Sequence, residues 1–351
     1  MHILYYTLSF ILMLCTFLPL VKHQYWIFRI ASFARIQIAI LLVPILGLGF
    51  YIHTTPWYLV SCIQLLLGVS LLHQLIILAP YINFSSPKKE TQQNNTISII
   101  SANVYQYNQN YDKLINLVRA QKPNILLTLE SNQKWEDALT ILDTDYPYQH
   151  KIALENTYGM HFYTDLEVEK IETHYFVADD IPSIEVHLKD KNGTLFVFYG
   201  VHPPPASPTE EPNSKEKDGE LAALAKRIKQ ETLPVLITGD FNSVAWSRIT
   251  KIFTKVSGLK DARKGKGFIA TFPVKYPLFR VPIDLLFHTA HFKTHTLTTL
   301  ASIDSDHFPL YIECSLKSNP KTTTSSKISL ETKEHVDELI QKGKDEISFQ
   351  R

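Results

Sequence analysis

An acid and an amide stand two residues apart directly after an apolar run, at Asp240 and Asn242. The run, residues 234–237 before Gly239, predicts a buried strand. Residues i and i+2 of an extended backbone point to the same side, so both side chains can enter one site. This pair suits a phosphate: the acid can hold a metal ion or a water, and the amide can donate to a phosphoryl oxygen without adding negative charge. The alternative is an Asx turn that ends the strand.

Further polar side chains stand where other predicted strands end: Asn103, Glu130, His202, Asp284, Asp306 and His307. Most have a structural alternative, such as a turn cap for Asn103 or a core position for His202. Asp284 is more telling, because a buried carboxylate is costly without a partner. A set of carboxylates, amides and two histidines without cysteine favours Mg²⁺ or Mn²⁺ over Zn²⁺. It predicts metal-assisted hydrolysis of a phosphate ester, because the chain has no Walker loop, nucleophile elbow or zincin motif.

The order of these motifs resembles the endonuclease/exonuclease/phosphatase superfamily, which has the deoxyribonuclease I-like fold. The resemblance covers residues 97–316 and rests on Asn103, Glu130, His202-Pro203, Gly239-Asp240-Phe241-Asn242, Ile283-Asp284 and Ser305-Asp306-His307. It implies an α/β (α+β) chain folded as a four-layer sandwich, with two packed mixed sheets and outer helices. The apolar front end resembles the membrane-anchored bacterial branch.

The resemblance also implies a metal site. Glu130 matches the principal Mg²⁺ ligand, with Asn103 beside it, and Asp306 would complete the metal shell, through a water or directly. No other cofactor is implied.

The catalytic roles follow in the same way. Asp240 matches the residue that orients or deprotonates the attacking water, and Asn242 would donate to the phosphoryl oxygen. His307 would contact the phosphate, oriented by Asp284. His202 matches a histidine near the leaving group, a candidate general acid, with Glu155 or Glu185 suggested as its acidic partner. Leu285 stands where many members carry a histidine.

The elements that must position these residues can be read from the apolar pattern. Strands are expected at 97–104, 125–130, 281–287 and 309–314, in addition to the one before Gly239. The pair Asn192-Gly193 predicts a hairpin between runs 184–188 and 195–201. Helices are expected around 114–118, 135–142, 221–228 and 244–253, and residues 260–282 are expected to form a basic loop.

Three apolar segments precede this region, at 3–21, 36–52 and 57–81. Each is about long enough to cross a bilayer, which takes roughly 20 residues. The sequence therefore predicts a multi-pass anchor, in a bacterial inner membrane if the family branch holds. A cleaved signal peptide is the alternative for the first segment. Lys22, Arg29 and Arg35 are assigned to the first loop, which can also be an amphipathic surface segment, so the side of the soluble domain stays open.

The predicted organisation has four parts: an anchor at 1–83, a linker at 84–96, a catalytic domain at 97–316 and a polar, loosely attached tail at 317–351. The first 81 residues hold no acid, which leaves 32 basic and 34 acidic residues for the rest. A near-neutral soluble part excludes a nonspecific nucleic-acid binder held by bulk charge.

The substrate that the sequence favours is DNA or RNA. The chain is therefore predicted to be a membrane-anchored Mg²⁺-dependent nuclease. His202 and the basic loop at 260–282 support this reading. The alternative is a phospholipid headgroup, cleaved by a sphingomyelinase- or phosphoinositide-like phosphodiesterase or phosphatase at the membrane. An inactive scaffold is the non-enzyme alternative. The sequence leaves the oligomeric state open.

Overall fold

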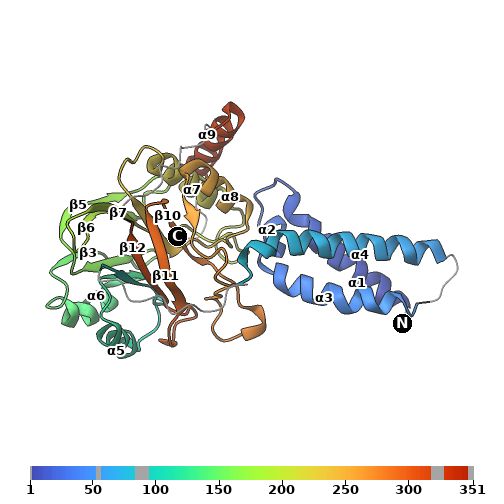
Figure 1. The fold of residues 1–351 in the computed structure, drawn as a ribbon, viewed down its shortest axis with the longest axis horizontal. Coiled ribbons are helices and arrows are strands. Elements are labelled where there is room, and N and C mark those ends of the chain that lie inside the picture. The colour runs from blue at the N-terminus through green and yellow to red at the C-terminus, as the bar shows by residue number, and fades with distance from the viewer. Residues whose placement is uncertain (1, 53–56, 84–94, 318–327, 347–351) are drawn as a thin grey trace.

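Two six-stranded mixed sheets lie face to face with helices outside them, in a computed structural model that describes residues 2–52, 57–83, 95–317 and 328–346 (Figure 1). The predicted four-layer α/β sandwich is confirmed. The first sheet has the order β11 (Phe292–Thr299), β12 (Leu310–Leu316), β1 (Ile97–Asn103), β2 (Ile125–Leu129), β4 (Met160–Thr164), β3 (Tyr148–Ile152). The second has the order β5 (Val168–His174), β6 (Ser183–Lys189), β7 (Leu195–Val201), β8 (Val235–Asp240), β10 (Asp284–His288), β9 (Lys260–Asp261).

The main core fills the space between the sheets. Strand β7 shows how the sequence builds it: Phe196 and Phe198 face the opposite sheet, while Val197 and Tyr199 face the outer helices. Such alternation follows from the two-residue period of a strand. Strands β1 and β2 are parallel, as are β7 and β8, so their carboxyl ends meet at one edge of each sheet.

Helices cover both outer faces. The first sheet carries α5 (Tyr111–Gln121), α6 (Gln133–Leu139) and the 3₁₀ turn η3 (Thr140–Leu142), and the second carries α7 (Lys215–Ile228) and α8 (Arg248–Ser257). A further helix, α9 (Leu330–Lys344), packs on α7 and buries Val336 and Leu339. The expectation of a loosely attached tail is therefore wrong for this helix, whose apolar side completes the core beneath it.

Most predicted elements are present, including the β6–β7 hairpin at Asn192-Gly193. The helix expected from residue 244 begins only at Arg248, because Ser247 caps it by accepting from the Thr250 amide. The basic loop at 260–282 contains the short strand β9 and the 3₁₀ turn η4 (Pro277–Phe279). Strand β11 was not foreseen.

The apolar N-terminal region forms a separate helical bundle (Figure 1). In the part of the chain that the structure describes, two helices are long and apolar enough to cross a membrane: α1 (His2–Phe17) continued by η1 (Leu18–Leu20), and α4 (Trp57–Leu78) continued by η2 (Ala79–Tyr81). The segment expected at 36–52 is the shorter α3 (Arg35–Gly49), bent by 75° against α2 (Ile27–Phe33). A third span exists only if this bent pair counts as one.

Two of the three cations assigned to the first loop lie in helices. Arg29 is part of α2, and Arg35 opens α3, where it is only 4% exposed and donates to the Gln74 side chain at 2.9 Å. The prediction of a loop is wrong for these two residues. Their charges lie at the end of the bundle that meets the domain.

The bundle docks directly on the sandwich. The Trp246 indole nitrogen donates to the Ser32 carbonyl at 2.7 Å, and the Gly265 amide donates to the Pro80 carbonyl at 2.8 Å. The Trp26 amide reaches the Pro212 carbonyl at 3.0 Å. The two parts are thus fixed to one another by contacts outside the predicted linker, whose residues 84–94 lie outside the described part of the chain.

Candidate active site

The predicted site residues gather where strands of both sheets end. Asn103 closes β1, Glu130 follows β2, and His202 follows β7. Asp240 ends β8 and is paired in register with Asp284, the first residue of the antiparallel β10. His307 lies in the turn before β12. The six positions therefore converge because of the topology, as the reading of strand ends predicts.

Asn103 joins the acids of the two sheets. Its Nδ2 donates to Glu130 Oε1 at 2.7 Å and to Asp240 Oδ2 at 3.3 Å. Its Oδ1 accepts from the Tyr105 amide at 3.0 Å. In this arrangement Asn103 presents nitrogen, not oxygen, to the centre, so it bridges the two carboxylates instead of offering a ligand oxygen between them.

Glu130 is half-buried and has a left-handed backbone, with φ of 60°. Such a conformation costs about 1–3 kcal/mol in a residue with a Cβ and recurs at functional sites. Burial raises the pKa of Glu130 to about 7, although hydrogen bonds from Asn103 and from the Gln106 amide lower it. The nearby Asp306 charge raises it further. The positive charge of His307 lowers the pKa of Glu130 but offsets its burial only in part.

The turn after β8 places Asp240 and Asn242. Gly239 has φ of 147°, and a Cβ there would lie 2.0 Å from the Val201 carbonyl oxygen, so only glycine fits. The Asn242 amide donates to Asp240 Oδ1 at 2.8 Å, which is the Asx turn considered as an alternative. Asp240 can form this turn and still serve the site, because only its Oδ1 is used in the turn and its Oδ2 remains directed at the site.

Asn242 is partly committed to the fold. Its Nδ2 donates to the Pro203 carbonyl at 3.0 Å. A side-chain amide nitrogen has two hydrogens, so this contact leaves one. The Asn242 carbonyl accepts from Lys217 Nζ at 2.8 Å.

Asp284 and His307 form a buried pair. His307 Nδ1 lies 2.9 Å from Asp284 Oδ2, and His307 Nε2 lies 3.6 Å from Asp240 Oδ2. Burial alone lowers the pKa of His307, but the Asp284 and Asp240 charges outweigh it and raise the pKa to about 10. Burial raises the pKa of Asp284, opposed by the His307 charge. The Asp284 carboxylate thus has the partner that its sequence context predicts.

His202 lies on the other side of Asp240. Its Nε2 is 3.8 Å from Asp240 Oδ2, and its ring lies 5.3 Å from the Tyr158 ring, centre to centre. Burial lowers the pKa of His202 to about 4. The suggested partners Glu155 and Glu185 are wrong: they bind Asn132 and Arg227, respectively.

Asp306 is held at the rim of the site by its neighbour. Ser305 Oγ donates to the Asn103 carbonyl at 2.7 Å and lies 3.4 Å from Asp306 Oδ1. The Asp306 side chain is half-buried, and its charge acts on both Glu130 and His307.

The donor set fits a hard divalent cation. Asn103 bridges the Glu130 and Asp240 carboxylates, and the Asp306 charge acts on Glu130. His307 Nε2 lies 3.6 Å from Asp240 Oδ2. Oxygen ligands of this kind suit Mg²⁺, Mn²⁺ or Ca²⁺. Asp240, Asp284 and His307 also place one donor atom each within 4.8 Å of one another, but the last two already bind each other.

Lys217 belongs to the site and was missed. It is 4% exposed, and burial lowers its pKa to about 8. The surrounding sequence, a run of lysine and glutamate at the start of α7, is typical of a solvated helix face, so no local signal marked it. Gln106 was also missed; its backbone N–H donates to Glu130 Oε2 at 3.3 Å.

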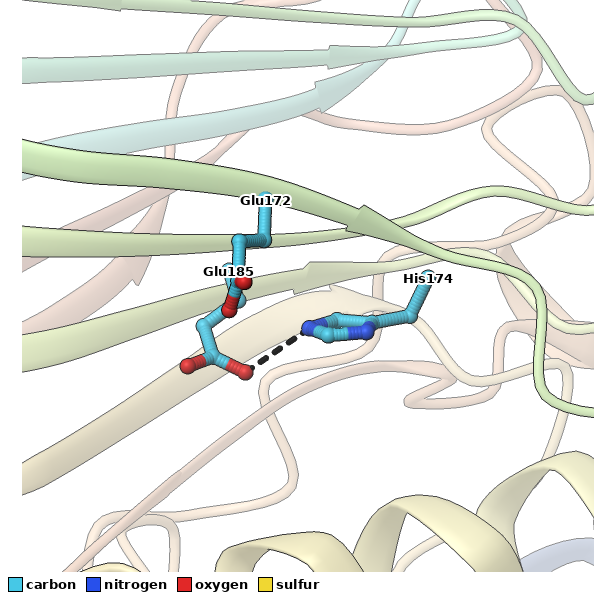
Figure 2. A group of neighbouring side chains, drawn as sticks. All are labelled: Glu172, His174 and Glu185. Carbon is cyan, nitrogen blue, oxygen red and sulfur yellow. Dashed lines mark hydrogen bonds and ion pairs between the residues drawn. The ribbon is translucent and has the colours of Figure 1, made fainter.

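A second carboxylate–histidine group lies elsewhere, on β5 and β6 beneath α7 (Figure 2). Glu185 is fully buried and binds His174 at 2.8 Å and His187 at 2.9 Å. Arg227 contacts both of its oxygens, at 2.9 and 3.1 Å. Its charge is satisfied by arginine, so this group stabilises the packing of α7 on the sheet.

The sequence model of the Endonuclease/Exonuclease/phosphatase family matches residues 100–307. No curated protein sequence matches the chain at a significant level. Humanized D. rerio TDP2 is similar in structure, with a TM-score of 0.53, 15% identity, and coverage of 63% of this chain and 99% of that one.

Two further solved structures are similar. The human Nocturnin catalytic domain with bound sulfate has a TM-score of 0.53, 14% identity, and coverage of 65% and 97%. A protein from Bacteroides thetaiotaomicron, described as a member of the same family, has a TM-score of 0.51 and 21% identity. The match covers 64% of this chain and 100% of that one. At these identities the likeness concerns the fold alone.

Proposed function

Because the chain belongs to the endonuclease/exonuclease/phosphatase family and is a metal-dependent phosphoric ester hydrolase, we propose that it is a membrane-anchored phosphodiesterase acting on phospholipid headgroups. The observation that carries the substrate choice is the loop 273–280, which runs from the site to the helical bundle. The sequence favoured nucleic acid; the surroundings of the site favour lipid.

The root of loop 273–280 lies against the site. The Val274 amide donates to the Asp306 carbonyl at 2.8 Å, and the Phe272 ring lies 4.8 Å from the His307 ring. The tip lies against α3, where Gln37 donates to the Leu278 carbonyl at 2.9 Å. Leu278 and Phe279 are 81% and 68% exposed. Exposed apolar side chains of this kind enter a lipid interface.

The anchor is supported by the outer surface of the bundle. Its helices expose large apolar side chains, such as Ile3 at 83%, Leu65 at 69% and Ile76 at 64%. A surface of this kind is stable in hydrocarbon and costly in water. We place α1 and α4 across the bilayer, with the bent α2–α3 pair beside them, in a bacterial inner membrane.

Each site residue has a proposed task. Asp240 takes a proton from the attacking water: Asn103 and the two histidines around its Oδ2 keep the carboxylate ionised and so able to accept it. Protonated His307 stabilises the charge that develops on the phosphoryl oxygens, and Asp284 fixes its orientation.

The remaining residues assist. Asn242 donates its second amide hydrogen to the phosphoryl group. Neutral His202 contacts the leaving-group oxygen, which takes a proton from solvent as its bond to phosphorus breaks. Glu130 and Asp306, with Asn103 as their support, would hold Mg²⁺, which polarises the phosphate when bound.

The nuclease reading is the second candidate. Tyr105 and Tyr107 stand just past Asn103, are 39% and 66% exposed, and form an edge-to-face pair, which suits base stacking. One of the similar structures is D. rerio TDP2 complexed with single-strand DNA product. The basic loop supports this reading less, because Arg263 is 1% exposed and Arg280 binds the Val274 carbonyl.

The test uses the full chain in phospholipid vesicles, with Mg²⁺ or EDTA. We expect EDTA-sensitive release of headgroups from the vesicles and little nicking of plasmid DNA. Leu278→Ser with Phe279→Ser should lower vesicle activity about tenfold, because less apolar surface enters the interface. Hydrolysis of soluble bis-p-nitrophenyl phosphate should be unchanged.

Ile141→Ser, at a residue that is 51% exposed and lies on the first sheet's outer helices, is the matched control and should leave both activities intact. Plasmid nicking without headgroup release would establish the nuclease instead.

A further inference from the structure

A cavity of about 500 Å³ lies between the helical bundle and the second sheet's helices. It is separate from the catalytic centre, but Ser243 and Lys217 line it, so it adjoins the far side of the turn that carries Asn242. Its walls come from η1, from the end of α4, from α2 and the start of α3, and from the first turns of α7 and α8.

Positive charge dominates the lining of this cavity. Among the described residues that line it, seven are lysine or arginine and one, Asp218, is acidic. Asp218 is shared: it lies 3.6 Å from Arg29 and accepts from Gln24 and Ser214. Other cations have neutral partners, such as Thr332 for Lys255. The walls therefore hold a strong excess of positive charge.

The hydrogen-bonding capacity of the walls is also incomplete. The buried Nε atoms of Arg29 and Arg35 and the buried Nε2 of His73 have no hydrogen-bond partner among the described residues. Arg35 itself is 4% exposed. Buried guanidinium groups are strong donors that favour phosphate and carboxylate oxygens.

The cavity also has an apolar wall. Ile76 and Ile77 of α4 and Leu20 of η1 line it, while the cations come both from the bundle, such as Arg29, and from α8, such as Arg248. A ligand that fits must therefore carry an anionic group for these cations and hydrocarbon for the apolar wall along α4. An anionic phospholipid combines these two parts, and in the proposed anchored arrangement the cavity would lie near the lipid headgroups.

We propose that this cavity binds an anionic phospholipid, with the phosphate held by Arg29, Arg248 and Lys251 and the acyl chains along α4. The inference rests on the proposed membrane anchor and is independent of the substrate. A free phosphate ion shares the headgroup chemistry but makes no use of the apolar wall.

The test compares the full chain in nanodiscs of phosphatidylcholine alone and of phosphatidylcholine with phosphatidylglycerol. Phosphatidylglycerol should raise the Tm by about 3 °C or more, because a ligand bound only by the folded state stabilises it. Arg248→Gln with Lys251→Gln should lose this rise. Lys134→Gln with Lys191→Gln removes the same charge from exposed positions elsewhere and should keep it.

Two further experiments test whether positive charge is what matters and whether phosphate alone is enough. The charge-retaining pair Arg248→Lys and Lys251→Arg should keep the rise. Inorganic phosphate, added to detergent-solubilised protein, should give none.

Absence of the phosphatidylglycerol effect in wild type, its survival in the glutamine pair, or an equal effect of phosphate alone would overturn the proposal. Hydrolysis of bis-p-nitrophenyl phosphate by the glutamine pair in phosphatidylcholine should match wild type, so a failed phosphodiesterase assignment is seen separately.

Discussion

Asp240 and Asp284 face each other as a cross-strand pair at the ends of β8 and β10, and both are 1% exposed. Like charges directly opposite one another destabilise a sheet. His307 offsets them, because one ring nitrogen binds Asp284 at 2.9 Å and the other lies 3.6 Å from Asp240. His307 therefore offsets the repulsion between the two carboxylates, and the two carboxylates in turn keep His307 charged and in place.

Asp284→Asn tests this arrangement. The variant should lose about 10²–10⁴-fold in kcat, because an amide can neither fix the imidazole nor stabilise its charge. With the Asp284 charge removed, the pKa of His307 falls from its raised value of about 10. The alkaline limb of the kcat profile should move to lower pH. A pH–rate profile on bis-p-nitrophenyl phosphate measures both effects; an unmoved alkaline limb would contradict the assignment of His307 as the protonated group.

Glu130→Gln and Asp240→Asn separate metal binding from proton transfer. Glu130→Gln should raise the Mg²⁺ concentration for half-maximal activity by about 10–100-fold, because a carboxylate ligand is lost. Asp240→Asn should lose about 10³-fold in kcat, which excess metal does not restore.

Titration of activity with Mg²⁺, beside circular dichroism of each variant, distinguishes the two. Recovery of Asp240→Asn at high Mg²⁺ would assign that residue to the metal instead.

Gly239→Ala should destabilise the domain by about 3 kcal/mol or more, because the new Cβ meets the Val201 carbonyl at 2.0 Å and the backbone is left-handed. Gly193→Ala is the control: its φ is also positive, at 79°, but the Cβ meets nothing within 4 Å. Its cost should be about 1 kcal/mol. Urea unfolding curves measure both; equal costs would show that the close approach at Gly239 is unimportant.

Glu185 should make the fold sensitive to acid. Burial raises the pKa of this carboxyl, but hydrogen bonds from His174, Arg227 and His187 outweigh it and hold the pKa well below the usual range. A depressed folded pKa gives stability that is present above the unfolded value, about 4.3, and is lost as pH falls below it. The Tm difference between wild type and Glu185→Gln should therefore be large at neutral pH and shrink below about pH 4.

Glu334→Gln, at an exposed position on α9, should show a small and constant difference. A gap for Glu185→Gln that stays constant with pH would show that the Glu185 charge adds no stability.

The strand ends could be predicted from the sequence because each buried run stops at a polar residue. The first of these strands ends at Asn103 and β8 ends at Asp240, as that rule predicts, whereas Asp284 begins β10 and is brought to Asp240 by the antiparallel pairing of β8 and β10. A local cue also indicated that Asp284 needs a partner, because it is a carboxylate in an apolar run; the choice of His307 was implied by the family resemblance.

Features set by tertiary packing could not be read in this way. Lys217 is polar and lies among charged neighbours, yet the bundle and the Asn242 turn enclose it. His202 lies near Asp240 because β7 and β8 are neighbouring parallel strands, and no spacing along the chain indicates this contact. Arg35 was assigned to a loop because its burial depends on Gln74, on another helix.

The docking of Trp246 on Ser32 and of Gly265 on Pro80 has a kinetic consequence. A domain on a slack tether sweeps a volume above the membrane and meets lipid at an effective concentration that the tether length sets. If the bundle spans a bilayer as proposed, these contacts would hold this domain at one height and one tilt. Its rate on lipid should then follow the mole fraction of substrate in the bilayer, and diluting the vesicles at constant composition should leave the turnover of each reconstituted molecule unchanged.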